Sequence, residues 1–125
     1  MTVEMSGNDR AVAAFMKYAR YGFHKRALSG FDMIDCIRGC TTGREEADEM
    51  LAVYDTLRLL SYMNKQQELR AVREVYFARQ GRRLRKNDVS LRVRRFAAEE
   101  FFDDRTVYRR LAAVKRLFLS VLARL

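Results

Sequence analysis

Proline is absent from all 125 residues of this chain, so the residue that breaks helices most strongly never occurs. Apolar residues recur three and four positions apart along most of the sequence, the spacing that places them on one face of a helix. Neither an alternating strand pattern nor an internal repeat is visible. The sequence therefore predicts an all-α protein of five or six helices.

Glycines and capping residues mark the ends of the expected helices. We expect a helix from Asn8 or Asp9 to about Tyr21, and further helices over 31–37, 43–64 and 66–79. Gly39 and Gly81 are expected to stop the helices that precede them. The segment from Thr42 to Glu45 has the pattern of a capping box, in which a hydroxyl and a carboxylate satisfy the first free amides.

Charge is distributed unevenly along the chain. Residues 1–64 carry a net charge of −1, whereas residues 65–125 carry +10. We expect one compact domain, with a neutral N-terminal helical support region (1–64) and a basic region (65–125). A concentrated positive charge is typical of a surface that binds a polyanion. The alternative is a solvated basic surface with no specific partner.

Several classes of protein are not expected. With 49% apolar residues the chain is too hydrophobic for a disordered tail, and no apolar run approaches the ~20 residues of a membrane span. The N-terminal residues do not resemble a secretory signal, so we expect a cytoplasmic protein without a membrane partner. Cys36, Cys40 and the single His24 provide too few groups for a zinc site or a catalytic triad. We therefore expect no enzyme, no metal and no cofactor.

The segment after Asn87 has the spacing of a helix-turn-helix. One helix is expected to begin at Asn87 or Asp88, with Val93, Phe96 and Ala97 facing inward. A second N-cap follows at Asp103 or Asp104, which leaves only a short turn between the two helices. Two helices joined in this way must cross steeply. The small residue Ala97 would permit the close crossing.

The last helix is expected to present arginines to solvent. At about 100° per residue, Val107, Leu111 and Val114 form a stripe toward the core, opposite Arg105, Arg109 and Arg116. A helix of this kind suits the DNA major groove, where arginine makes bidentate hydrogen bonds to guanine. The alternative is an ordinary solvated face. The residues expected to read base edges are Arg105, Thr106, Tyr108, Arg109 and Arg116.

A run of basic residues precedes and enters the helix-turn-helix. Lys and Arg in such a run neutralise phosphates and fix the register of docking without reading the sequence. A flexible basic loop is the alternative. The residues expected to bind phosphates are Arg82, Arg83, Arg85, Lys86, Arg92 and Arg95.

These motifs carry a resemblance to a known family. Three segments resemble the C-terminal helix-turn-helix of ArpU/RinA-type transcription regulators of phages and mobile elements. They are LRAVREVYF at 69–77, Arg95-Phe96-Ala97, and Arg105-Thr106-Val107-Tyr108-Arg109. More distantly, they are similar to region 4 of RNA polymerase sigma factors. The resemblance covers the second half of the chain and implies binding near promoters in a bacterial or phage-infected cell. Glu100 and Phe101 stand where the general motif has an apolar residue followed by glycine.

The leading hypothesis is a sequence-specific regulator that binds double-stranded DNA, with RNA polymerase as a possible second partner. The alternative is a helical inhibitor or adaptor whose basic face binds an acidic protein groove in a nucleoprotein complex or polymerase; RNA binding is a third option. The last helix also has heptad-like spacing from Val107 to Leu125. This stripe would either pack on the N-terminal helices or form a homodimer seam.

Overall fold

The computed structural model describes residues 7–77 and 88–125, and these residues are all-helical. Within them lie six α-helices, a short 3-10 helix (η1) and a π-helical segment (η2), and no strand. The elements are α1 (Gly7–Arg20), η1 (Phe23–Lys25), α2 (Gly30–Cys40), α3 (Arg44–Tyr62), α4 (Gln66–Val72), η2 (Arg73–Phe77), α5 (Asp88–Glu99) and α6 (Asp104–Ala123). The predicted fold class is confirmed.

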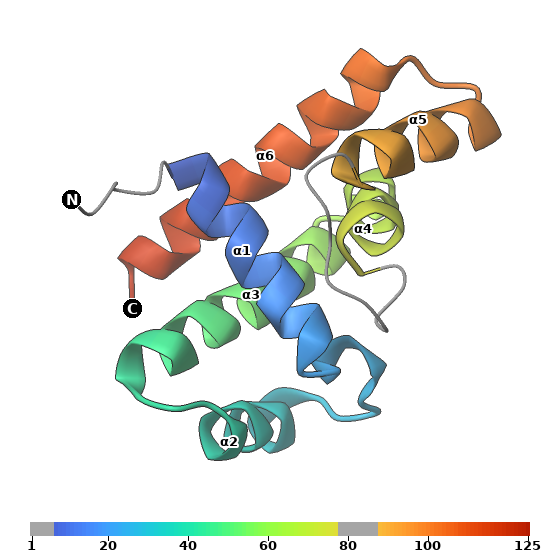
Figure 1. Ribbon diagram of the computed structural model, residues 1–125. Helices are drawn as coiled ribbons and strands as arrows, with labels where there is room; N and C mark the ends of the chain where they lie inside the picture. Colours follow the sequence, from blue (N-terminus) through green and yellow to red (C-terminus); the bar gives the residue numbers. More distant parts are fainter. Residues whose placement is uncertain (1–6, 78–87) are drawn as a thin grey trace.

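The core joins the two halves of the chain. The ring of Phe15 on α1 lies 5.8 Å from that of Tyr76 on η2 and 5.6 Å from that of Phe118 on α6, between ring centroids. Figure 1 shows α1 lying across α3 and α6, and the three helices contact one another. Residues from 11 to 121 thus share one hydrophobic cluster. The N-terminal and C-terminal halves therefore pack around one core.

Gly39 does not stop the second helix, contrary to expectation. α2 continues through Gly39 to Cys40, and Thr41 closes it by donating its amide proton to the Ile37 carbonyl at 3.1 Å. A glycine inside a helix costs roughly 0.5–1 kcal/mol relative to alanine. The burial of Met33 and Ile37 on the same helix outweighs this cost, because each fully buried aliphatic side chain contributes about 1.5–3 kcal/mol.

The capping box predicted at Thr42–Glu45 is wrong in its partners. Gly43 is the N-cap of α3, and no side chain caps the first turn. The carboxylate that reaches back belongs to Glu46, which accepts a hydrogen bond from the Thr42 amide at 3.1 Å. Glu45 does not reach back: 85% of its side chain is exposed, and its carboxylate lies 4.0 Å from the Arg10 guanidinium. Glu46, one position further along the helix, therefore makes the contact that was expected of Glu45.

The helix expected over 66–79 changes its geometry at Arg73. α4 ends at Val72 and continues as the π-helical η2 to Phe77, after which residues 78–87 lie outside the described part. A π-helical turn places successive side chains at a smaller angle than an α-helix does. Val75, Tyr76 and Phe77 are accordingly all buried, although a regular helix would turn one of them outward.

The apolar stripe of α6 is covered by the chain itself. Val107, Leu111, Val114, Phe118 and Val121 are each at most 4% exposed, and α6 packs against α1, α3, α4 and α5. Leu125, the last position of the heptad-like series, is 58% exposed. The first alternative, packing on the N-terminal helices, therefore describes this stripe. A homodimer through α6 stays a prediction and would have to use the remaining surface of the helix.

No described helix is both long and apolar enough to cross a membrane.

Candidate nucleic-acid interface

Four residues, 100–103, connect α5 to α6. Asp103 caps α6, as the sequence predicts, because its side chain accepts a hydrogen bond from the Arg105 amide at 3.2 Å. The Phe102 amide donates to the Ala97 carbonyl at 2.8 Å and closes the end of α5. Ala97 itself is 1% exposed and belongs to the core cluster. The small side chain that was expected to permit a close crossing is thus buried.

The turn uses Phe101 where a glycine is usual. Phe101 adopts a φ of 59°, in the left-handed region, and its side chain is 96% exposed. An L-residue in this conformation costs roughly 1–2 kcal/mol because its Cβ approaches the neighbouring carbonyl. Neighbouring contacts must therefore hold the turn in place.

Two arginines of the surrounding helices provide such contacts. Arg70 on α4 forms an ion pair with Glu100, and its guanidinium lies 5.9 Å from the centroid of the Phe96 ring. Arg110 on α6 lies over Phe102, 4.3 Å from the ring centroid. Both residues that flank Phe101 are therefore fixed by cations. These arginines stabilise the turn, a role that the sequence pattern does not predict for either of them.

The exposed side of α6 carries an arginine face, formed by Arg105, Arg109 and Arg116. All three side chains are exposed, on the side opposite the buried stripe, as the helix angles predict. None of them forms an ion pair with a described residue. Arg105 and Arg109 are one helical turn apart, and like charges at that spacing destabilise a helix by roughly 0.2–0.5 kcal/mol. A bound polyanion would relieve this repulsion.

Thr106 and Tyr108 flank the arginine face on its two sides. Thr106 is half-buried and Tyr108 is 43% exposed. Burial raises the pKa of the Tyr76 hydroxyl above its ordinary value, and the nearby Tyr108 adds to the increase. Tyr108 therefore lies between the surface and the core.

The α5 arginines divide between surface and interior. Arg95 is exposed, as expected of a phosphate contact, and so is Arg94. Arg92 is half-buried, and its guanidinium donates to the Val75 carbonyl at 2.8 Å, which ties α5 to η2. Sequence reasoning left Arg94 out of the phosphate-binding set. The angular positions around α5 would have indicated that Arg94 is exposed, because its angle from the buried side formed by Val93 and Phe96 is larger than that of Arg92.

The remaining expected phosphate contacts, Arg82, Arg83, Arg85 and Lys86, lie outside the described residues.

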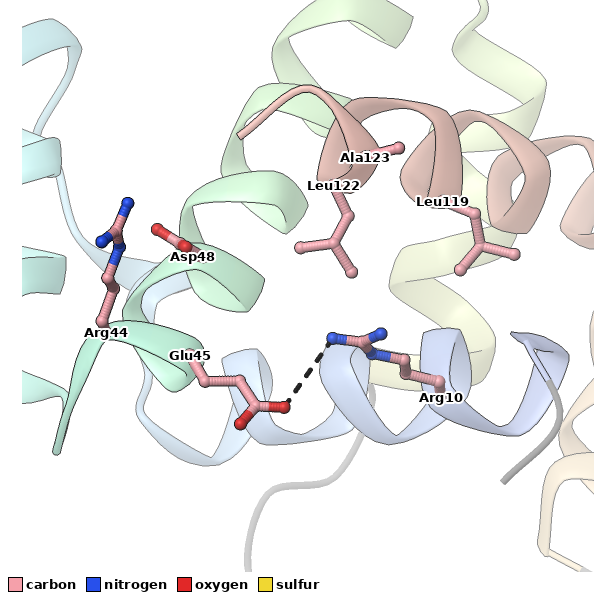
Figure 2. Close-up of a pocket in the computed structure, with 7 residues that line it drawn as sticks. All are labelled: Arg10, Arg44, Glu45, Asp48, Leu119, Leu122 and Ala123. Carbon is pink, nitrogen blue, oxygen red and sulfur yellow. Dashed lines mark ion pairs between the residues drawn. The ribbon is translucent and has the colours of Figure 1, made fainter. Parts of the chain in front are cut away.

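A shallow hollow of about 530 Å³ lies near the other end of α6 (Figure 2). Leu119 and Leu122 form its apolar wall, and Arg10 on α1 faces Glu45 on α3 across it at 4.0 Å. Arg10 also pairs with Glu49 at 3.5 Å. The charges of this hollow are thus balanced within the chain, and it contains no residue of the predicted site.

The two cysteines lie together on α2 without forming a metal site. Cys36 is half-buried and Cys40 exposed; burial, followed by the neighbouring Cys40, raises the pKa of the Cys36 thiol. Among residues 7–77 and 88–125, no three His, Cys, Asp or Glu side chains are grouped as metal ligands would be.

No protein-family model, curated protein or solved structure matches this chain. The resemblance to ArpU/RinA-type regulators therefore stays a prediction that rests on residues 69–77, 95–97 and 105–109.

Proposed function

We propose that this protein is a sequence-specific DNA-binding regulator of transcription. The observation that carries the proposal is the arginine face: Arg105, Arg109 and Arg116 are exposed and unpaired among the described residues, directly opposite the buried stripe of α6. α6 follows a short turn, and its first residues lie at one end of the molecule (Figure 1). A major groove admits one helix presented in this way.

In the proposed complex the first three turns of α6 enter the major groove. Arg105 and Arg109 read base edges, and a good bidentate contact to guanine contributes about 1–3 kcal/mol of discrimination. Thr106 and Tyr108 flank this contact on its two sides, and Arg116 reaches the groove edge about two helical turns beyond Arg109.

Arg94 and Arg95, which are exposed on α5, would meet the phosphate backbone. Phosphate contacts fix the register of a protein on the duplex and contribute affinity that is independent of sequence. The basic run that includes Arg82 and Lys86 would extend the same contact. RNA polymerase as a second partner, and a bacterial or phage-infected cell as the setting, follow from the family resemblance.

The proposal is tested by selection from a random duplex library with the purified protein, followed by titration of the enriched duplex at several salt concentrations. We expect a recurrent sequence and a linear fall of log affinity with log salt, with a slope of about −0.9 per phosphate neutralised. If no duplex binds at low salt, the proposal is wrong, and the acidic-protein alternative would then be examined with polymerase.

A further inference from the structure

A second basic feature lies away from the arginine face, in a cavity of about 410 Å³. We name it the basic cavity. Residues of α1, η1, the loop after η1, α2, α3, α4 and η2 line it, so segments far apart in the sequence converge on it. Its volume lies within the range of roughly 300–1,000 Å³ that is usual for small-molecule sites.

Cations surround this cavity without carboxylates. Arg26, Arg58 and Arg73 line it together with His24, and no Asp or Glu does. Arg26 and Arg73 form no ion pair with any residue in the described ranges, and the one such pair of Arg58 is a loose contact of 4.0 Å with Asp55. Among the described residues, Arg26 and Arg73 therefore line the cavity without an ion-pair partner, and Arg58 has only this loose contact.

The inner wall of the cavity is aromatic and apolar. Tyr18, Phe23 and Phe77, each at most 6% exposed, line it, and so does Met33, which is 1% exposed. The His24 ring lies 4.9 Å from that of Phe77, between centroids, and its Nδ1 is buried without a hydrogen-bond partner among the described residues. An apolar wall with convergent polar groups at its edge is typical of small-molecule sites.

We propose that the basic cavity binds a small organic anion with an aromatic or apolar body, such as an aromatic carboxylate. The body would pack on Phe23 and Phe77, and the carboxylate would accept charge-assisted hydrogen bonds from Arg26 and Arg73. A cationic ligand would meet repulsion from all three arginines. The proposal does not depend on DNA binding, because it rests on residues outside α5 and α6.

The test compares two probes of similar shape, 2-naphthoate and the neutral 2-naphthalenemethanol, by calorimetry and by amide chemical shifts of the full chain. We expect the carboxylate to bind about tenfold more tightly or better, since hydrogen bonds to a charged group are stronger than neutral ones. The largest shifts should fall on residues that line the basic cavity.

Variants distinguish binding by Arg26 and Arg73 from a general effect of the positive charge of the protein. Arg26→Gln and Arg73→Gln should each weaken 2-naphthoate binding about tenfold while leaving the affinity for the alcohol unchanged, which also shows that the cavity still folds. Arg124→Gln, an exposed arginine that does not line the cavity, should change neither affinity. Equal affinity for the two probes, no saturable binding of 2-naphthoate, or an equal loss in Arg124→Gln would overturn the proposal.

Discussion

Arg70 on α4 and Glu100 in the α5–α6 turn form a two-point ion pair, in which the Arg70 Nη1 lies 3.2 Å from the Glu100 Oε2 and Nη2 meets Oε1. This pair links α4 to the four-residue turn between α5 and α6. Because both side chains are partly exposed, the strength of this ion pair should depend on salt.

Replacing Glu100 by Gln should lower the free energy of unfolding by about 1 kcal/mol at low salt, and by less at 0.5 M salt, because exposed ion pairs are weak and screened. Urea unfolding at the two salt concentrations measures the effect. Glu99→Gln is the matched control, since Glu99 is exposed and forms no ion pair with a described residue. The same loss in both variants would contradict a specific role for the pair.

Phe101→Gly should stabilise the protein although it removes a large side chain. The left-handed conformation costs Phe roughly 1–2 kcal/mol, whereas the greater freedom of glycine in the unfolded chain costs about 0.5–1 kcal/mol. At 96% exposure the ring contributes little packing. Thermal and urea unfolding should show a net gain of about 0.5–1 kcal/mol. Phe101→Ala keeps the strain, so an equal gain in that variant would refute this explanation.

Asp103→Ala should destabilise α6 by about 1 kcal/mol, because the Arg105 amide loses its acceptor. Asp103→Asn retains an acceptor oxygen and should lose less. The unfolding free energies of the two variants are compared by denaturant unfolding, and the dependence of these free energies on denaturant concentration should be the same in both. Equal losses in both would mean that the negative charge, rather than the hydrogen bond, is what α6 requires.

Stability at acid pH should depend on Glu46. The Tyr21 hydroxyl, then the Thr42 amide and Lys17, donate to its carboxylate and hold its pKa below the ordinary value of 4.5. A lowered pKa in the folded state contributes stability that is complete above pH 4.5 and is lost as the pH falls through the folded value. Unfolding free energies measured from pH 6 to pH 3 should fall less steeply in Glu46→Gln. If the unfolding free energy of Glu46→Gln falls as steeply toward pH 3 as that of the unaltered protein, this assignment is wrong.

Periodicity predicted the parts of the fold that burial determines. The inward faces of α5 and α6 are as expected, with Val93, Phe96, Val107 and Leu111 all buried. These positions follow from the 3.6-residue repeat alone. The arginine face follows equally, because it is the opposite side of the same helix.

Features decided by tertiary contacts were not predictable in this way. Gly39 stays helical because Met33 and Ile37 of the same helix are buried. Glu46 replaces Glu45 because Tyr21 and Lys17 lie near it, and Arg92 turns inward because the Val75 carbonyl accepts from it. Each of these outcomes needs a partner more than fifteen residues away or a sum of packing energies. A local pattern contains neither.

The most direct test of the DNA-reading role is the ratio of affinities for the selected duplex and a scrambled duplex, measured for Arg109→Ala and Arg94→Ala. Arg109→Ala should lower this ratio roughly tenfold, the loss of one base contact of about 1–3 kcal/mol. Arg94→Ala should weaken both duplexes alike and leave the ratio unchanged, as a phosphate contact does. If Arg109→Ala weakens both duplexes equally, α6 does not read bases and the central claim is wrong.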